Sequence, residues 1–311
     1  MNKEKVRNDR DIEFAHPLKL YKKLIINAAI TGMVPQKKDT PFVPITVDEI
    51  IDDSMKCISS GTSILHIHAR DYDEKPTYKA EVFSKIIEGI RSVYPEVVIC
   101  VTTSGRTYNE FEKRSEVLDL DGFVKPDMGS LTLGSLNFPD KASVNEPEMI
   151  MKLAEKMKLK GIKPELEIFD TGMINTAKFL YSNGYIDPPF YFNVILGSVY
   201  SSQAKVSDLV HLVSLLPESA IWAGGGIGIF QTVVNCAAII MGGHVRIGIE
   251  DNIWYDHYRK ELTTNQKSIE RLKRIAAELN REIASPEETR QMLGLGMRSD
   301  QEIVLSANKM I

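Results

Sequence analysis

The feature that most constrains the fold is a regular alternation of short apolar runs with longer amphipathic segments. The apolar runs occupy residues 24–30, 64–69, 97–102, 122–128, 164–169, 190–196, 220–225 and 245–250. Helical spacing of apolar residues recurs over residues 47–59, 80–93, 111–118, 148–159, 173–182, 206–216, 230–241 and 266–279. Strand-like runs that alternate with helical segments in this way predict parallel βαβ units.

Eight such units in a chain of 311 residues fit a (β/α)8 TIM barrel, and the competing architecture is a doubly wound open sheet. The open sheet predicts a glycine-rich fingerprint after the first strand, whereas residues 31–35 read TGMVP. We therefore expect a barrel, with a short helical appendage at residues 286–293 that packs outside it. No linker or repeat divides the chain, so we expect an N-terminal extension (residues 1–22) and one TIM-barrel domain (residues 23–311).

Composition limits which classes of binding partner and which cellular compartment we expect for this protein. The net charge is −4, which gives no electrostatic footprint for nucleic acid or an anionic membrane surface. No apolar run is long enough to span a bilayer, and the charged residues 1–14 lack the apolar core of a secretory signal. Cys57, Cys100 and Cys236 lie far apart and lack CxxC spacing, which favours a reducing compartment. We expect a cytoplasmic protein.

Two histidines lie two residues apart in the second apolar run, within the sequence SILHIHARD. Because side chains alternate between the faces of a strand, His66 and His68 share one face. Neighbouring imidazoles can bind one metal ion, and neutral imidazole is a common zinc ligand. The alternative is a pair of hydrogen-bonded structural histidines. The cost of burying two polar rings without a partner favours the metal.

The last apolar run, within HVRIGIEDN, supplies a candidate third ligand because alternation places Arg246 and Glu250 on one face. Glu250 beside His66 and His68 would complete a site with an open position, as in catalytic zinc centres. The alternative is that Glu250 forms a salt bridge with Arg246. Asp251 follows directly, as a candidate base beside the metal or as a capping acid of the loop.

Further candidates lie where the other strands are expected to end, because TIM barrels carry their active sites at the carboxyl ends of the strands. Residues 102–105 (TTSG) form a hydroxyl-rich turn suited to a carboxylate, and residues 125–130 (KPDMGS) end the fourth run. Glu165 and Glu167 share one face of the fifth run. Residues 224–228 (GGGIG) predict either a phosphate-binding turn or a tight turn that requires glycine.

The assembled pattern resembles the β-keto acid cleavage enzyme family from about residue 24 to residue 295. The matching sequences are AAITG (28–32), PIT (44–46), HIHARD (66–71), LEIFD (166–170) and MGGHVRIGIEDN (241–252). The last of these is long and specific. The resemblance implies a zinc-dependent TIM barrel, usually a homotetramer, which converts a β-keto acid and acetyl-CoA into acetoacetate and a new CoA thioester.

By position, the resemblance implies that His66, His68 and Glu250 bind zinc, and that Asp251 removes the proton next to the ketone with assistance from Arg246. Zinc would act as a Lewis acid. The substrate carbanion would attack the acetyl thioester, and a retro-Claisen step would release acetoacetate. No cysteine is placed as a nucleophile.

The substrate-binding positions differ from the family in three places. Thr102 replaces a serine and Ser130 replaces a threonine, and both keep a hydroxyl, so carboxylate binding together with Gly105 is still implied. Val34 stands where members that act on 3-keto-5-aminohexanoate have a glutamate for the ammonium group. We therefore expect a substrate whose far end is neutral and apolar.

Other functions remain open on the same barrel. A metal-dependent hydrolase usually carries HxH on the first strand and further histidines on the fifth and sixth, unlike this chain. A zinc aldolase or lyase that uses a keto acid without CoA fits the same residues, and dependence on acetyl-CoA distinguishes it. A non-catalytic metal-binding barrel is the third alternative.

Overall fold

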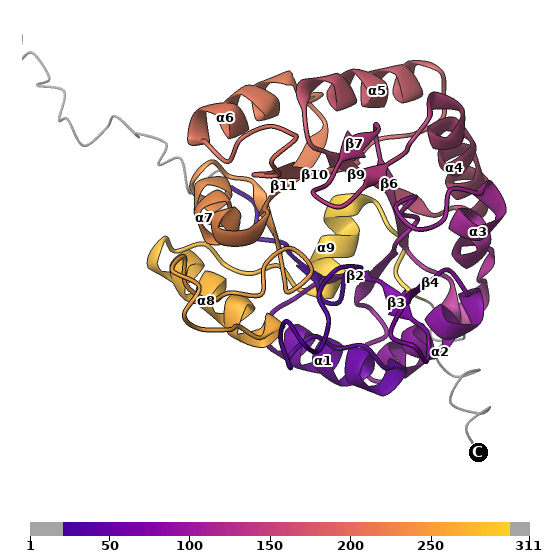
Figure 1. Cartoon of the computed structure of the whole chain (residues 1–311). Coiled ribbons are helices and arrows are strands. Elements are labelled where there is room, and N and C mark those ends of the chain that lie inside the picture. Colours follow the sequence, from indigo (N-terminus) through magenta and orange to yellow (C-terminus); the bar gives the residue numbers. More distant parts are fainter. Residues whose placement is uncertain (1–20, 299–311) are drawn as a thin grey trace, which may run out of the picture.

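The computed structural model describes residues 21–298, and it confirms the predicted barrel. Eight parallel strands close in the order β1-β12-β11-β10-β9-β6-β5-β2, and helices surround them (Figure 1). The strands are β1 (Ile26–Ala29), β2 (Ile64–Ile67), β5 (Val98–Val101), β6 (Met128–Thr132), β9 (Lys163–Ile168), β10 (Phe190–Leu196), β11 (Ala220–Gly226) and β12 (His244–Ile247). The expected N-terminal extension lies outside the described residues, apart from residues 21 and 22.

Helices follow the predicted segments closely. They are α1 (Val47–Ser59), α2 (Ala80–Arg91), α3 (Phe111–Ser115), α4 (Pro147–Lys160), α5 (Thr171–Ser182), α6 (Val206–Leu215), α7 (Gln231–Ile240), α8 (Asn265–Glu278) and α9 (Pro286–Leu293). Local chemistry explains the starts of several of them. Thr46 and Glu49 form a reciprocal capping box on α1, and Asp170 accepts a hydrogen bond from the N–H of Met173 at the start of α5. Within residues 21–298, no helix has the length and apolar character needed to cross a bilayer.

Two small antiparallel hairpins are inserted after strands of the barrel. One pairs β3 (Ala69–Arg70) with β4 (Pro76–Thr77), and the other pairs β7 (Leu136–Asn137) with β8 (Ala142–Ser143). The predicted second strand is therefore divided, because its last residue, Ala69, leaves the barrel and pairs with β4 together with the following Arg70. The predicted third helix is also shorter, and it continues as the 3-10 helix η3 (Glu116–Asp119).

The prediction for the fourth strand was wrong. Residues 122–124 form the 3-10 helix η4 (Gly122–Val124), and the strand begins at Met128. Pro126 explains the shift, since proline has no N–H for a ladder and restricts the residue before it. Lys125 and Asp127 consequently lie at the amino end of β6, not at the end where a barrel has its active site.

The eighth strand is shorter than predicted and does not reach Glu250. The strand ends at Ile247, and Gly248 adopts φ +154 where a side chain would lie 2.0 Å from the carbonyl oxygen of Ala29. The chain then turns tightly, because the N–H groups of Asp251 and Asn252 both donate to the Gly248 carbonyl. Glu250 and Asp251 therefore belong to a turn at the end of the strand.

The C-terminal helix closes the amino end of the barrel. Figure 1 shows α9 within the ring of strands. Leu293 is fully buried against an apolar layer inside the barrel that includes Ile64, Met128 and Tyr191. Arg290 donates to Asp127 at 2.9 Å and to the carbonyls of Glu96 and Val97 just before β5. The helix expected at residues 286–293 is present, but the expectation that it packs outside the barrel was wrong, because its apolar residue Leu293 fills the amino end of the barrel and the helix forms the floor.

Candidate active site at the carboxyl end of the barrel

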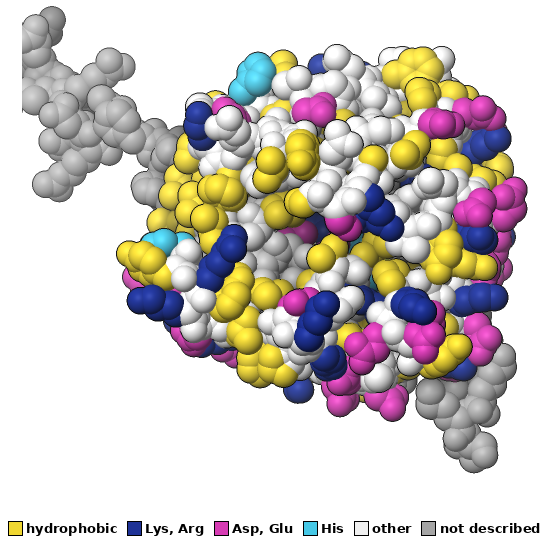
Figure 2. Space-filling model, viewed as in Figure 1, with side chains coloured by type: hydrophobic (Ala, Val, Ile, Leu, Met, Phe, Trp, Pro, Cys, Tyr) yellow, Lys and Arg dark blue, Asp and Glu magenta, His cyan; other side chains and the backbone are white. Residues whose placement is uncertain are grey.

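A cavity of ≈ 710 Å³ lies at the carboxyl ends of the strands. Figure 2 shows the corresponding hollow in the centre of this face. Eight of the nine predicted site residues line the cavity: Val34, His66, His68, Thr102, Ser130, Arg246, Glu250 and Asp251. The ninth, Gly105, packs behind the wall, where a side chain would meet the Arg114 guanidinium at 2.5 Å. The structure therefore brings together positions that are far apart in the sequence.

The three predicted metal ligands form a tight cluster. The Nε2 atoms of His66 and His68 are 3.3 Å apart, and Glu250 Oε1 lies 3.4 Å from His68 Nε2 and 3.8 Å from His66 Nε2. Ligand atoms about 2.0–2.1 Å from a tetrahedral zinc ion are themselves separated by roughly 3.3 Å. Glu250 Oε2 is buried and has no hydrogen-bond partner among the described residues. Oε1 thus lies beside the two imidazoles while Oε2 is left without a partner, and a carboxylate with unused acceptor capacity beside two histidines fits a bound cation.

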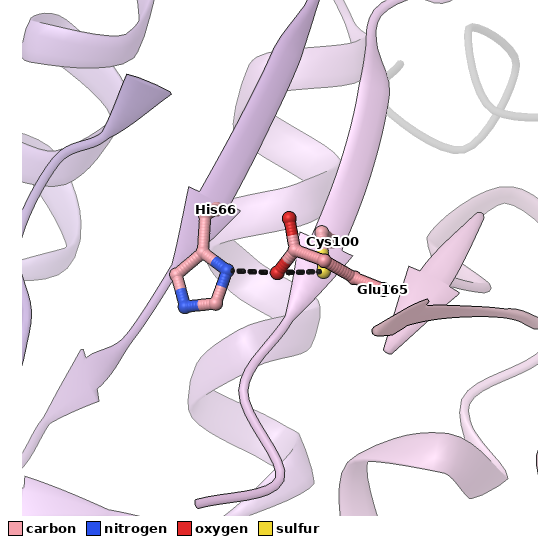
Figure 3. A group of neighbouring side chains, drawn as sticks. All are labelled: His66, Cys100 and Glu165. Carbon is pink, nitrogen blue, oxygen red and sulfur yellow. Dashed lines mark hydrogen bonds and ion pairs between the residues drawn. The ribbon is translucent and has the colours of Figure 1, made fainter. Parts of the chain in front are cut away.

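Glu165 holds the first of these histidines from behind. His66 Nδ1 lies 2.6 Å from Glu165 Oε2, and the Cys100 thiol lies 3.3 Å from the same oxygen. Figure 3 shows the three side chains pointing toward one another. The 2.6 Å contact leaves no space for an ion on this side. A hydrogen bond from Nδ1 directs Nε2 into the cluster, which is the usual support of a metal-binding histidine. Burial raises the pKa of Cys100 well above its usual value, so the thiol stays protonated.

Arg246 is surrounded by carboxylates. Its side chain contacts Asp251 Oδ2 at 2.9 Å, Glu250 Oε1 at 2.8 Å and Glu167 Oε1 at 3.3 Å. The salt bridge between Arg246 and Glu250 considered from the sequence also forms. It uses Oε1, the same oxygen that lies 3.4 Å from His68 Nε2, and it leaves Oε2 without a partner among the described residues. A buried arginine paired with several acids fixes their positions.

The two neighbouring acids at the end of β12 have opposite pKa shifts. Burial raises the pKa of Asp251 above its usual value, against the attraction of Arg246, and the charge of Glu250 adds to the rise. Burial also acts on Glu250, but His68, Arg246 and His66 outweigh it and hold its pKa well below the usual range. Adjacent groups separated in this way suit different roles, one as a permanent anion and the other as a proton acceptor.

Two hydroxyls face the cavity, one directly after β5 and one within β6. Thr102 Oγ1 accepts the N–H of Ser104 at 3.1 Å, and Ser130 Oγ accepts the N–H of Thr103 at 3.2 Å. Because each oxygen already accepts a backbone hydrogen bond, its own O–H can be donated to a ligand. These hydroxyls are suited to an anionic group such as a carboxylate.

The loop after β1 connects the cavity mouth to Glu250. Gly32 adopts φ +65, and a side chain there would lie 2.6 Å from Cγ of Glu250. Arg70 donates to the Gly32 carbonyl at 2.9 and 3.2 Å and so holds this loop. Val34, two residues further along, is 55% exposed and lines the cavity.

Glu165 and Glu167 are the functional residues to which sequence reasoning gave no role. Their signal was two acids on one face of an otherwise apolar strand, and both point into the barrel. Asn27 donates to Glu165 at 2.6 Å, and Thr132 donates to Glu167 at 2.7 Å.

Other candidates lie elsewhere or have a packing role. His244 is at the amino end of β12, where Nδ1 accepts the N–H of Ile25 at 2.9 Å. Asp71 caps its own turn. The glycines at 224 and 226 pack against α7, where side chains would meet Ala238 and the Phe230 carbonyl at 2.8 and 2.6 Å. Close packing therefore accounts for these glycines without a phosphate.

Comparison with known proteins extends the resemblance noted from the sequence. A 3-keto-5-aminohexanoate cleavage enzyme from Fusobacterium nucleatum subsp. nucleatum is 39% identical over 279 residues, which cover 89% of this chain and 99% of the relative. A 3-oxoadipate:acetyl-CoA acetyltransferase from Cupriavidus necator is 34% identical over 274 residues, which cover 87% of this chain and 94% of the relative.

A solved structure shares the fold at low sequence identity. The binary complex of ObcA with oxaloacetate superposes with a TM-score of 0.75 at 17% identity, covering 83% of this chain and 68% of that one. The family model for beta-keto acid cleavage enzymes matches residues 23–295. The chain therefore belongs to the beta-keto acid cleavage enzyme family.

Proposed function

We propose that this protein is a zinc-dependent enzyme that condenses a β-keto acid with acetyl-CoA. The carbon–carbon bond of the acid is cleaved, and the products are acetoacetate and a CoA thioester of the remaining acyl group. The observation that carries the proposal is the cluster of His66, His68 and Glu250 beside Asp251 at the base of a large cavity. The relative from Cupriavidus necator has acetyl-CoA in its name, which supports the co-substrate.

His66, His68 and Glu250 would hold the zinc ion and leave a coordination position open. Bound zinc supplies a Lewis acid that stabilises negative charge on a ketone oxygen. Two-histidine, one-carboxylate sites also hold iron, so metal analysis belongs to the test. The negative charge of Glu250 and the hydrogen bond from His66 to Glu165 both strengthen the binding of a dication.

Asp251 is proposed as the base that removes the proton next to the ketone. Arg246 holds Asp251 Oδ2 at 2.9 Å, while Oδ1 is 3.5 Å from the guanidinium and is the oxygen left to accept a proton. The raised pKa of Asp251 makes it a stronger base than an exposed aspartate. Its cavity position places it within reach of a substrate held by the metal ligands.

The substrate carboxylate is proposed to bind the hydroxyls of Thr102 and Ser130, with Gly105 shaping the turn between them. Gly105 suits this role because a side chain there would displace Arg114. Arg114 donates to the carbonyl of Thr103 at 2.8 Å and so supports the same turn. Fixing one end of the acid orients its ketone toward the metal ligands and Asp251.

The far end of the substrate is proposed to be neutral and apolar. Val34 lies at the cavity mouth with Met33, Ile253 and Trp254, all of which offer apolar surface. Asp39 also lines the cavity, but its carboxylate accepts the N–H of Gln36 in its own turn. An ammonium group beside Val34 would lose water without gaining a charged partner.

The test compares three six-carbon acids with purified enzyme and acetyl-CoA: 3-oxohexanoate, 3-keto-5-aminohexanoate and 3-oxoadipate. We expect kcat/KM for 3-oxohexanoate to be highest by about tenfold or more, since an unpaired charge costs at least 1–3 kcal/mol. Val34→Glu is expected to improve the amino-substituted acid selectively. A preference of the unaltered enzyme for the amino-substituted acid contradicts the apolar far end.

The role of Asp251 as the base is tested with Asp251→Asn. We expect turnover to fall by about 10²–10⁴, with the zinc content per chain unchanged in elemental analysis. Asp52→Asn, on the exposed face of α1, is the matched control and is expected to keep full activity. Product formation without acetyl-CoA would favour the aldolase or lyase alternative, and full turnover of Asp251→Asn would remove the proposed base.

We further propose a homotetramer in the cytoplasm. The outer faces of α6 and α7 expose Val206, Val210, Val233 and Ile240, each about half exposed or more. Adjacent apolar side chains on neighbouring helices are typical of a buried subunit contact. For the proposed homotetramer, sedimentation equilibrium measures the molecular mass in solution, and a mass equal to that of one chain excludes the tetramer.

The proposed cytoplasmic location is supported by the cysteines. All three are unpaired, in keeping with a reducing compartment.

A further inference from the structure

Three arginines line the cavity, and only one of them lacks an acidic partner within residues 21–298. Arg246 is held by the acids of the site. Arg106 pairs with Asp140 and lies 4.2 Å from the centre of the Phe138 ring. Arg259, at the mouth, is exposed and makes no ion pair with the described acids. An unneutralised guanidinium on the wall of a cavity is a binding group for an anion.

The loop that carries Arg259 is rigidly built. We call residues 254–262 the rim loop. Its ends pair through the bridge between Trp254 and Leu262 and a 2.8 Å hydrogen bond from the N–H of Tyr255 to the carbonyl of Glu261. The Asp256 carboxylate accepts three backbone N–H groups of the loop, at 2.8 to 3.0 Å. These hydrogen bonds within the loop fix the backbone that carries its tip.

The backbone of the rim loop is also unusual at Arg259. This residue adopts φ +58, a left-handed conformation uncommon for residues other than glycine, asparagine and aspartate. Below it, the guanidinium of Arg271 lies 3.3 Å from the centre of the Tyr255 ring. The loop thus holds a charged residue where glycine would be the easier choice, which points to a role for the side chain.

The tip of the rim loop combines aromatic rings with cations. The rings of His257 and Tyr258 lie 3.7 Å apart, and Tyr258 is 70% exposed. Lys260 Nζ lies 5.4 Å from the centre of the Tyr258 ring. Exposed aromatic rings stack with nucleobases, and neighbouring Arg and Lys side chains bind phosphates. Figure 2 shows further Lys and Arg side chains around the hollow on this face.

We propose that the rim loop binds the nucleotide end of acetyl-CoA, with Arg259 and Lys260 at the phosphates and Tyr258 against the adenine. This inference rests on the proposed function, because acetyl-CoA is the co-substrate there. Arg259 lines the same cavity as the metal cluster and Asp251, so the uncharged pantetheine arm lies inside the cavity. The phosphates then stay at the solvent-exposed mouth, where their hydration is kept.

The experiment uses three co-substrates: acetyl-CoA, acetyl-dephospho-CoA and S-acetylpantetheine, which lacks the nucleotide. Arg259→Asn removes the charge with a residue that tolerates the left-handed backbone, and Arg259→Lys restores the charge. We expect Arg259→Asn to raise the KM for acetyl-CoA by roughly tenfold and to leave kcat unchanged. The KM for S-acetylpantetheine is expected to be the same in the variant and in the unaltered enzyme. Arg259→Lys is expected to recover most of the affinity. Arg274→Ala, on the exposed surface of α8, is the control for a general loss of positive charge.

The outcomes separate this inference from the proposed function. If acetyl-CoA turns over normally and Arg259→Asn keeps the full preference for acetyl-CoA over S-acetylpantetheine, the rim loop does not bind the nucleotide. Calorimetric titration with CoA itself gives a measurement independent of turnover. A second outcome is that no β-keto acid reacts, while the unaltered protein binds CoA more tightly than the Arg259→Asn variant does. In that case the rim loop binds CoA, and the proposed reaction is wrong. Equal CoA binding by the two proteins overturns the inference.

Discussion

At the scale of single residues, the site depends on a side chain that does not face the cavity. Glu165 is completely buried, and it accepts hydrogen bonds from Asn27 at 2.6 Å and from His66 Nδ1 at 2.6 Å. Burial alone would raise its pKa, but His66 and Arg246 outweigh burial and lower it, so the carboxylate is charged. A charged acceptor behind an imidazole makes the opposite nitrogen a stronger metal ligand.

We expect Glu165→Gln to weaken zinc binding by roughly 10–100-fold, because the amide keeps the shape of the carboxylate and removes its charge. Competition with a chromophoric chelator measures the dissociation constant. Glu167→Gln is the matched control, since Glu167 bonds to Thr132 and Arg246 and not to a histidine. Equal losses in the two variants would mean that total charge, and not support of His66, controls the affinity.

How far the residues of the site are predictable depends on what alternation can tell. It places His66 and His68 on one face, and the closed barrel brings Glu250 to them although the strand ends before it. Alternation also places Glu165 on an inner face, but it does not show which side chain lies opposite. That information comes from the barrel, because β9 and β2 are not neighbours in the sheet.

At the scale of elements, α9 shows that a helix can be found in a sequence while its position is not. Ser285 and Glu288 form a capping box and Gly294 ends the helix, so residues 286–293 were predictable as a helix. Its packing inside the amino end of the barrel depends on the apolar floor formed by several strands. The fourth strand was placed wrongly for a different reason. Residues 122–128 contain an apolar run that resembles a strand, but Pro126 interrupts it and the strand begins only at Met128.

We expect Leu293→Ala to lower the free energy of unfolding by about 2–5 kcal/mol, because it opens a cavity beneath the barrel. The kcat of the variant is expected to be unchanged, since the site is at the opposite end of the strands. Urea denaturation measures the loss, and Leu159→Ala is the control because Leu159 is 82% exposed. A large drop in kcat without loss of stability would show that the floor influences the site directly.

At the scale of the whole molecule, the buried His244 makes stability depend on pH. Burial, with the charges of Arg281 and Lys22, lowers the pKa of His244 to about 3 in the folded protein. In the unfolded chain histidine titrates near 6.5, so between these values only the unfolded chain binds the proton. The stability that the folded protein has with His244 neutral is therefore fully present above pH ~6.5, and it is lost progressively as the pH falls toward ~3.

From this linkage we expect His244 to destabilise the fold by about 2 kcal/mol on going from pH 7 to pH 5. His244→Asn keeps an acceptor for the N–H of Ile25 and removes the titrating group. The variant is therefore expected to lose about 2 kcal/mol less than the unaltered protein over this range, as measured by urea denaturation at both values. Identical losses would assign the acid sensitivity to the carboxylates alone.

The contact between Gly32 and Glu250 has a consequence for how new specificities arise on this barrel. Any side chain at position 32 would press on Glu250, the proposed metal ligand, whereas position 34 has an exposed side chain only two residues away. Under the proposed function, a substitution at position 34 therefore changes the preferred acid without pressing on Glu250. A library randomised at position 34 is expected to explore different acids, and one randomised at position 32 is expected to yield inactive proteins.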